Sequence, residues 1–364
     1  MILKQTKIIF YNQKGQGAGY YNNKIIYLDF VILNEVVEFE ILAEFKNYYK
    51  GKVTKIIEAS PNRNYDLPLN YELIGGYELI HMNLEAEAEY KKYVVKNDYK
   101  NIAKFDVNKE LELNYFQGKK EFRYRNKITL FDGALYQKAS HKKIFLNDFL
   151  LTDIKPKTNL KGKVILRKLD KLVVGTKKDV ELFNTDNLLG LMFRININSF
   201  YQINKEVAEK AYLEIINLVD TNDIVLDLYS GIGTISLLVA QKAKKVIAVE
   251  QNKFAHIDAL FNKKQNKIEN ISFNNQEVSL FLKDFNEKID TIIVDPAREG
   301  MGKKVVEEIL RLKPKKIIYL SCNPATQAYD FSLLKNNYKI SFMQIFNMFV
   351  KTFHIETLIC LERI

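Results

Sequence analysis

Cys322 is the residue whose type and place in the chain most strongly suggest chemistry. It follows an apolar run, 316–320, typical of a buried parallel strand, and the segment 324–334 after it has a helical pattern. Open α/β sheets place their chemistry at the carboxyl ends of strands, where this thiol would lie. A helix N-terminus beside it would also favour thiolate over thiol. An isolated cysteine is more often a small buried hydrophobe, so this assignment depends on the motifs around it.

A strand followed by a glycine turn comes earlier in the chain. The apolar run 224–228 leads through Tyr229 to Gly231 and Gly233, and a helical pattern follows. Glycines let the backbone turn sharply and approach a ligand closely. Glu250 ends the next apolar run, nineteen residues after Gly231. A carboxylate at that distance is placed to accept hydrogen bonds from a ribose diol.

The residue at position 236 separates the two kinds of cofactor that such a turn can hold. A nicotinamide-binding turn carries a third glycine there, whereas this chain has Ser236, and Asp227 precedes the turn. We therefore expect S-adenosylmethionine rather than a dinucleotide. An α/β turn that holds no ligand is the alternative interpretation.

Three more motifs complete a set that occurs in a recognisable order. Asp295 ends an apolar run in Asp-Pro-Ala-Arg, Glu356 stands just before a last apolar run, and Gln202 lies in Ser-Phe-Tyr-Gln-Ile-Asn. Together with the motifs above, they make residues 193–361 resemble the RNA (uracil-5-)-methyltransferase family, which makes 5-methyluridine in tRNA and 23S rRNA. The family usually has a second proline where Ala297 stands, a minor departure.

The resemblance implies a class I S-adenosylmethionine-dependent enzyme that works through a covalent adduct. Carbon 5 of uracil is a poor nucleophile, so a thiolate must first add to carbon 6, and a base must later remove the hydrogen from carbon 5. The resemblance implies Cys322 as the nucleophile and Glu356 as the base. The residues it implies around the cofactor or the target ring are Gln202, Tyr229, Gly231, Gly233, Glu250 and Asp295.

Other residues near these motifs receive structural interpretations. We expect Arg298 to order the loop after Asp295, and His354 is either a neighbour of the base or a structural histidine. Cys360 lies in an apolar run and is expected in the core. Two cysteines in 364 residues favour a reducing compartment without disulfides. No signal peptide or long apolar run is visible, so we expect a cytoplasmic protein that does not enter a membrane.

The length and the patterns predict a fold that combines α/β and β parts in two or three domains. Short strands around a predicted glycine-rich loop at 15–19 favour an OB-like barrel, which resembles the TRAM domain of several RNA-modifying enzymes. A helix is expected over 84–96. The predicted domains are a barrel at 1–60, a central, mixed and β-rich RNA-binding domain at 61–190, and a Rossmann-like methyltransferase domain at 191–364.

The segment 74–82 bears on a second cofactor. It resembles the family's Gly-Gly-Cys stretch, where many relatives bind a four-iron cluster through four cysteines. Tyr77 occupies the cysteine position here, and neither Pro68 nor Ile74 can ligate iron. We therefore expect no iron–sulfur cluster and no metal.

Positive charge is concentrated in one part of the chain. Residues 119–178 hold 17 lysines and arginines against 5 acidic residues, whereas the whole chain has a net charge of +11. Aromatic and basic side chains alternate in 122–125. Lysines that neutralise phosphates provide non-specific RNA affinity, and aromatic rings can stack on unpaired bases. The stretch predicts an RNA interface, and a solvated basic face is the alternative.

The substrate is less closely defined than the reaction. The amino-terminal barrel resembles the 23S rRNA branch of the family, so we expect rRNA, with the T-loop uridine of tRNA as the alternative. A cytosine C5-methyltransferase would carry its cysteine after Asp295, where none stands. A non-catalytic RNA-binding factor of the same fold is a further alternative. A monomer is the expected state.

Overall fold

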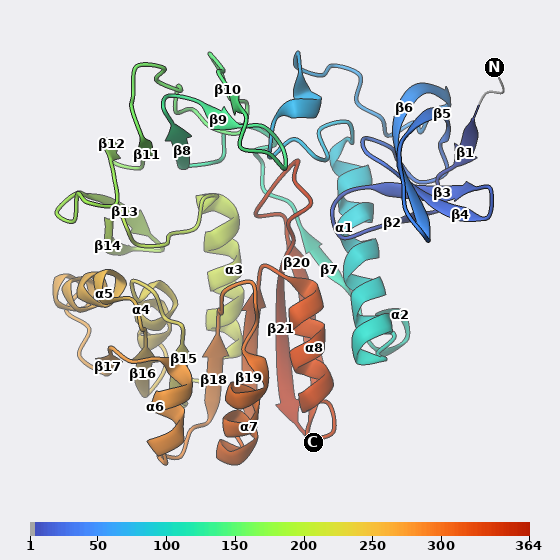
Figure 1. The fold of residues 1–364 in the computed structure, drawn as a ribbon. Coiled ribbons are helices and arrows are strands. Elements are labelled where there is room, and N and C mark those ends of the chain that lie inside the picture. The colour runs from blue at the N-terminus through green and yellow to red at the C-terminus, as the bar shows by residue number, and fades with distance from the viewer. Residues whose placement is uncertain (1–3) are drawn as a thin grey trace. The chain divides into compact units, whose positions relative to one another are not determined.

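The computed structural model describes residues 4–364, so the first three residues of the predicted barrel lie outside it. The described chain divides into two compact units (Figure 1). The predicted domain boundaries near residues 60 and 190 stay predictions. The first unit contains the chain up to Asn97 with Tyr136–Ile144 and Phe349–His354, and the second contains Asp98–Leu135, Phe145–Met348 and Ile355–Ile364.

A six-stranded sheet forms much of the first unit. Its order is β1-β5-β6-β4-β3-β2, and β1 and β2, at the two ends, are successive segments of the chain. The sheet therefore curls until its edges meet. Ile8, Ile26, Leu28, Val37 and Phe39 belong to the buried core of this sheet. The strands are β1 (Gln5–Lys7), β2 (Phe10–Tyr11), β3 (Gly17–Tyr21), β4 (Lys24–Leu28), β5 (Val36–Glu44) and β6 (Tyr48–Glu58).

The glycine-rich segment 15–19 differs from its predicted form. We expected a loop, but Gly17 and Gly19 lie inside β3. A Cβ atom at Gly17 would stand 2.5 Å from Val31 Cγ2, and one at Gly19 would stand 2.4 Å from the Lys7 carbonyl oxygen. The curled sheet brings its strands so close at these points that only glycine fits. These glycines therefore serve packing between strands rather than a turn.

Buried charges hold the rest of the first unit together. Helix α1 (Leu84–Asp98) presents Glu87 and Lys91, whose Oε1 and Nζ atoms lie 2.8 Å apart in the interior. Lys351, also fully buried, donates to the Met82 carbonyl oxygen at 2.6 Å and lies 3.7 Å from Glu87. A buried charge without a partner is costly, so these contacts fix the segment that leads to the last strand. The short turn η1 (Tyr71–Leu73) completes this unit.

An eight-stranded sheet organises the second unit (Figure 1). Its order is β17-β16-β15-β18-β19-β21-β20-β7, with parallel pairs from β17 to β19 and antiparallel pairing of β21. The α/β fold expected for the carboxyl-terminal part is thus confirmed. The strands are β7 (Asn114–Phe116), β15 (Ile224–Leu228), β16 (Lys245–Val249), β17 (Ile271–Asn274), β18 (Thr291–Val294), β19 (Lys316–Ser321), β20 (Tyr338–Phe346) and β21 (Glu356–Arg363).

Helices connect these strands. Buried apolar faces attach them to the sheet, as in α7, whose Val305, Val306 and Ile309 are buried. Two short helical segments precede β7. The helices are η2 (Tyr99–Ala103), α2 (Val107–Glu110), α3 (Lys205–Leu218), α4 (Thr234–Ala240), α5 (Lys253–Gln265), α6 (Val278–Asp284), α7 (Gly302–Leu312) and α8 (Pro324–Leu334).

Smaller sheets lie between β7 and α3 in the chain. β8, β11 and β12 form one, and β13 and β14 form a hairpin. Arg167, fully buried on β11, donates to the carbonyl oxygens of Asn196 at 3.0 Å and Ser199 at 2.8 Å, which fixes the approach to α3. The strands are β8 (Lys127–Phe131), β9 (Leu135–Tyr136), β10 (Lys143–Ile144), β11 (Lys163–Lys168), β12 (Leu172–Gly175), β13 (Phe183–Leu188) and β14 (Leu191–Asn196).

Within residues 4–364, none of the helices has the length and apolar character that crossing a bilayer requires.

Substitution of Gly19 tests the closed packing of the first sheet. Gly19→Ala should lower the free energy of unfolding of this unit by about 1–3 kcal/mol, because the added methyl meets the backbone of Lys7. Gly75→Ala is the matched control, since nothing lies within 4 Å of a Cβ atom there. Amide hydrogen exchange of the six strands measures the difference. Equal protection in both variants would contradict the packing argument.

Candidate active site

Four parallel strands end beside one another, and the residue that follows each strand places its side chain at the same edge of the sheet. Tyr229 follows β15, Glu250 follows β16, Asp295 follows β18 and Cys322 follows β19. The expected strand and helix on either side of Cys322 are confirmed. This edge is where open α/β sheets gather their functional groups.

The antiparallel strand β21 brings Glu356 to this edge. Its register pairs Ser321 of β19 with Thr357. Continued by one residue, the register sets Cys322 opposite Glu356, and facing residues of an antiparallel pair have Cα atoms about 4.5–5.5 Å apart. A thiol and a carboxyl group thus stand side by side at the end of the sheet.

The Cys322 thiol is held in its protonated form. Burial raises the pKa of Cys322 to about 11, and the charges of Glu356 and Asp295 raise it as well. This outcome is opposite to the expected effect of the helix N-terminus. Asn323 caps α8 and accepts the Ala325 N–H at 3.2 Å, so part of that helix end is already satisfied. Burial and the two carboxyl groups therefore raise the pKa of Cys322 by more than the rest of the helix N-terminus lowers it.

The Arg298 guanidinium is the group that opposes this effect. Its charge and its hydrogen bond to the thiol lower the pKa of Cys322. The Arg298 carbonyl oxygen accepts from Asn323 Nδ2 at 2.9 Å and from Thr326 Oγ1 at 3.1 Å, which ties its loop to α8. The residue therefore orders its loop through its backbone, as expected, while its side chain serves the thiol, which the sequence did not indicate.

Buried Glu356 and half-buried Asp295 form a carboxyl pair. Burial raises the pKa of each, and the charge of Asp295 raises the pKa of Glu356 further. The Glu356 side chain is 1 % exposed, and neither of its oxygens has a hydrogen-bond partner within residues 4–364. Because two like charges this deep repel, the pair retains a proton at neutral pH. Such a pair can take up and release protons during a reaction.

Tyr212 of α3 is a second residue that the sequence did not indicate. It is buried, and burial and then the charges of Asp295, Glu356 and Asp227 raise the pKa of its hydroxyl well above the usual value. Its helical position is typical of a core aromatic, so only the fold reveals that it adjoins the carboxyl groups.

Asp227 connects this carboxyl pair with the glycine turn. Burial raises the pKa of Asp227 to about 7, and the charges of Asp295 and Glu250 add to the effect. The Ser236 hydroxyl donates a hydrogen bond to the Asp227 carboxylate. The serine that replaces the third glycine of a dinucleotide turn thus has a partner of its own inside the site.

The glycine turn forms an open cradle. Gly231 and Gly233 have φ of +57° and +81°, and a Cβ atom at Gly231 would meet nothing within 4 Å. Glu250 accepts the Gly231 N–H at 2.8 Å and the Asn252 N–H at 2.5 Å, which orients its carboxylate beside the turn. Tyr229 enters the turn with φ of 64°, a left-handed conformation rare for a residue with a side chain.

Gln202 lies between β14 and α3 with its side chain buried. Its Oε1 atom has no hydrogen-bond partner among the described residues, and its carbonyl oxygen accepts Asn126 Nδ2 at 2.9 Å. A buried amide without a protein partner suggests a ligand in its place.

Three further residues considered in the sequence analysis pack against neighbouring side chains or lie in the interior. His354 contacts the rings of Phe353 at 4.2 Å and Phe349 at 5.8 Å, all within the first unit. Cys360 is buried inside β21, as expected. Tyr77, at the position of the cluster cysteine, is also buried. In the part of the chain that the structure describes, no group of three or more His, Cys, Asp or Glu side chains is arranged to hold a metal ion.

Comparison with known proteins decides the family. The model of the tRNA (uracil-5-)-methyltransferase family matches residues 135–364. An uncharacterized RNA methyltransferase of Mycoplasma mobile is 47% identical over 100% of this chain and 99% of its own length. The chain belongs to the tRNA (uracil-5-)-methyltransferase family. It is an RNA-modifying enzyme.

Other relatives match over nearly the whole chain. An uncharacterized RNA methyltransferase of Clostridium tetani is 30% identical and covers 95% of this chain and 93% of its own. Among solved structures, the tRNA (uracil-54, C5)-methyltransferase of Pyrococcus abyssi in complex with S-adenosyl-L-homocysteine superimposes with a TM-score of 0.75. It covers 98% of this chain and 100% of its own at 23% identity, which shows a shared fold.

The raised pKa of Cys322 predicts how its reactivity depends on pH. The thiolate fraction should rise about tenfold per pH unit up to about pH 10, because the pKa lies near 11. Alkylation of the free enzyme by iodoacetamide, followed by mass spectrometry at each cysteine, should show a slope near 1 from pH 7 to 9.5. Arg298→Ala should slow alkylation at every pH in this range. A plateau below pH 9 would mean that the thiolate is already formed.

Proposed function

We propose that the protein methylates carbon 5 of a uridine in RNA, using S-adenosylmethionine, through a covalent bond from Cys322 to carbon 6 of the base. The observation that supports this most directly is the register of β19 and β21, which sets Cys322 opposite Glu356. Nucleophilic addition at carbon 6 and removal of a proton from the adjacent carbon 5 need a thiol and a base a few ångströms apart.

The residues at the glycine turn fit S-adenosylmethionine. The open space at Gly231 admits a ligand close to the backbone, and Glu250 is oriented to accept from a ribose diol. The unpartnered Oε1 of Gln202 and the carboxyl group of Asp295 supply polar groups for the cofactor or the target ring. Tyr229 and Gly233 complete the proposed set. When bound, the cofactor supplies an electrophilic methyl group on a sulfonium.

Cys322 starts the proposed reaction. The thiol releases its proton to solvent, and Arg298 stabilises the thiolate that results. The carboxyl pair then still holds a single proton, on Asp295, and Glu356 remains a carboxylate. The sulfur then bonds to carbon 6 of the uracil, and the electron pair of the carbon 5–carbon 6 double bond moves toward carbon 5 and the carbonyl at carbon 4. Carbon 5 thereby becomes able to accept a methyl group.

Glu356 ends the reaction. After carbon 5 carries the methyl group, the Glu356 carboxylate takes the remaining hydrogen from that carbon as a proton. The double bond forms again and the bond between sulfur and carbon 6 breaks. The raised pKa of Glu356 makes it a stronger base than an ordinary carboxylate, as this step requires.

The two amino-terminal domains would hold the RNA. We propose that the curled sheet of residues 1–60 is a TRAM-like barrel and that 61–190 is an RNA-binding domain. On the barrel, the ring of Tyr27 lies 6.4 Å from Phe10 and 5.6 Å from Tyr48, and Tyr48 stacks on Phe45 at 4.5 Å. Such a row of partly exposed rings supports stacking with unpaired bases.

For the target RNA, we propose two candidates, 23S rRNA and tRNA. We predicted 23S rRNA because of the amino-terminal barrel. The tRNA enzyme of Pyrococcus abyssi, however, matches 98% of this chain, so the barrel has a counterpart in a tRNA-specific protein. The T-loop uridine of tRNA is therefore an equal candidate. A flipped-out base is required in either RNA, because the thiol must reach carbon 6.

Substitution of Cys322 tests the activity and its substrate together. Cells that lack the protein should lose 5-methyluridine from one RNA, and mass-spectrometric mapping should find it in 23S rRNA or tRNA. The wild-type gene should restore the mark, whereas Cys322→Ala should lower methyl transfer by about three orders of magnitude or more. Cys360→Ala, in the core, is the control and should restore it. Full turnover by Cys322→Ala would overturn the covalent mechanism.

Substitution of Glu356 tests the last step alone. Glu356→Gln cannot accept the proton from carbon 5, so the enzyme should accumulate joined to methylated RNA. A denaturing gel with labelled RNA should reveal the slower band, which Cys322→Ala should abolish. Glu362→Gln, on the same strand, should turn over normally. If Glu356→Gln releases product at the normal rate, another residue is the base.

A further inference from the structure

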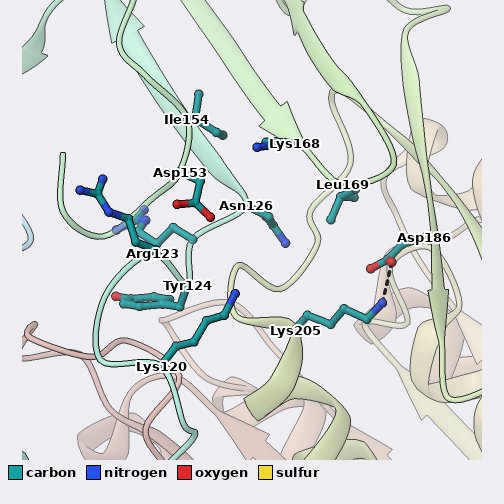
Figure 2. A pocket seen from close by; sticks show the side chains of 11 residues that line it. Lys120, Arg123, Tyr124, Asn126, Asp153, Ile154, Lys168, Leu169, Asp186 and Lys205 are labelled. Atoms are coloured by element: carbon teal, nitrogen blue, oxygen red, sulfur yellow. Dashed lines mark hydrogen bonds and ion pairs between the residues drawn. The ribbon is translucent and has the colours of Figure 1, made fainter. Parts of the chain in front are cut away.

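We propose that a basic pocket in the second unit binds one phosphodiester of the RNA and sets the position of the strand relative to Gln202. This inference rests on the proposed function and deepens it. The pocket has a volume of about 280 Å³ and lies among residues before β8, at the end of β11 and at the start of α3 (Figure 2). The basic residues of its lining suit a phosphate group.

Positive charge dominates the lining of the pocket. Five lining residues are basic and two, Asp153 and Asp186, are acidic. Lys205 is neutralised by Asp186, with Nζ 2.8 Å from Oδ1, and Arg123 is paired with Asp148 outside the lining. The other basic residues are Lys120, Arg125 and Lys168.

Two of these charges have no counterion among the residues that the structure describes. Lys120 and Lys168 are exposed, and neither forms an ion pair within residues 4–364. They come from separate segments, and Figure 2 shows Lys120 extending toward the space between the lining residues. Two unneutralised ammonium groups at one hollow are the charge that a phosphodiester requires.

An unpaired hydrogen-bond donor belongs to a residue that lines the pocket. The Arg125 Nε–H donor is buried and has no partner among the described residues. The apolar side chains of Ile154 and Leu169, with the ring of Tyr124, form the rest of the lining. An apolar wall lowers the local dielectric constant, which strengthens attraction between a phosphate and the lysines.

The lowered pKa of Lys127 indicates the same excess of positive charge near the pocket. This residue follows Asn126 in the chain, and burial lowers its pKa to about 8. The charges of Arg167, Lys163, Lys177 and Arg125 lower it further. Each of these neighbouring cations would attract an anion that binds in this part of the second unit.

Asn126 connects the pocket to the candidate active site. Its side-chain Nδ2 donates to the Gln202 carbonyl oxygen at 2.9 Å, and its backbone N–H donates to the Ile203 carbonyl oxygen at 3.0 Å. Lys205 follows Gln202 by three residues and begins α3. A phosphate held in the pocket is therefore fixed relative to the segment that carries Gln202.

Removal of the two free charges tests the proposal. The variant Lys120→Ala/Lys168→Ala should bind the substrate RNA about tenfold more weakly at low salt. Its log–log salt slope should be shallower by about 1.4, since each single-strand phosphate contact contributes about 0.7. KM should rise while kcat stays within about twofold. Lys264→Ala/Lys339→Ala removes two exposed lysines elsewhere in the unit and should match the wild type.

Neutral linkages locate the phosphate. Replacing one phosphodiester at a time by methylphosphonate should weaken wild-type binding strongly at one position, and the double variant should lose nothing more at that position. Equal losses in both proteins at every position would overturn the proposal. Strong competition by inorganic phosphate alone would also overturn it, in favour of a small-anion site. In either case, methylation by the wild type would leave the proposed function standing.

Discussion

The antiparallel pairing of β21 with β19 is the constraint on which the candidate site depends. In a parallel sheet, the carboxyl ends of all strands lie at the same edge. Four residues that directly follow such strands therefore lie at this edge: Tyr229, Glu250, Asp295 and Cys322. An antiparallel strand begins at that edge instead. It adds Glu356, which continues the register with β19 by one residue and whose charge acts on the thiol. The fold thus sets two groups of complementary chemistry side by side without a long loop.

The same pairing creates an electrostatic problem that shapes the chemistry. Glu356 and Asp295 form a carboxyl pair, and their charges raise the pKa of the neighbouring thiol. At neutral pH the carboxyl pair therefore holds a proton, and the thiol keeps its own. Arg298 is the one described cation that lowers the pKa of both Cys322 and Glu356. Reactivity therefore has to come from what binds, not from a thiolate formed in advance.

Sequence patterns predicted what depends on neighbouring residues and missed what depends on distant ones. The strand before Cys322 and the helix after it were predictable because apolar runs and a Pro near the helix start are local signals. Gly17 and Gly19 were assigned to a loop because the crowding that requires them comes from Val31 and the Lys7 carbonyl. The high pKa of the thiol depends on partners far along the chain, so a rule about helix ends gave the wrong direction.

The charged groups discussed above lie in two different environments, the candidate active site and the basic pocket. In the candidate active site, buried groups face one another at short range, where the low dielectric constant makes each charge change the protonation of its neighbours. In the basic pocket, Lys120 and Lys168 are exposed and form no ion pair within residues 4–364, so salt can screen their charges. Asn126 touches both regions, since it lines the pocket and bonds to the segment of Gln202. A phosphate bound in the basic pocket would therefore lie at a fixed place relative to Gln202, while the carboxyl groups beside Cys322 keep their own surroundings.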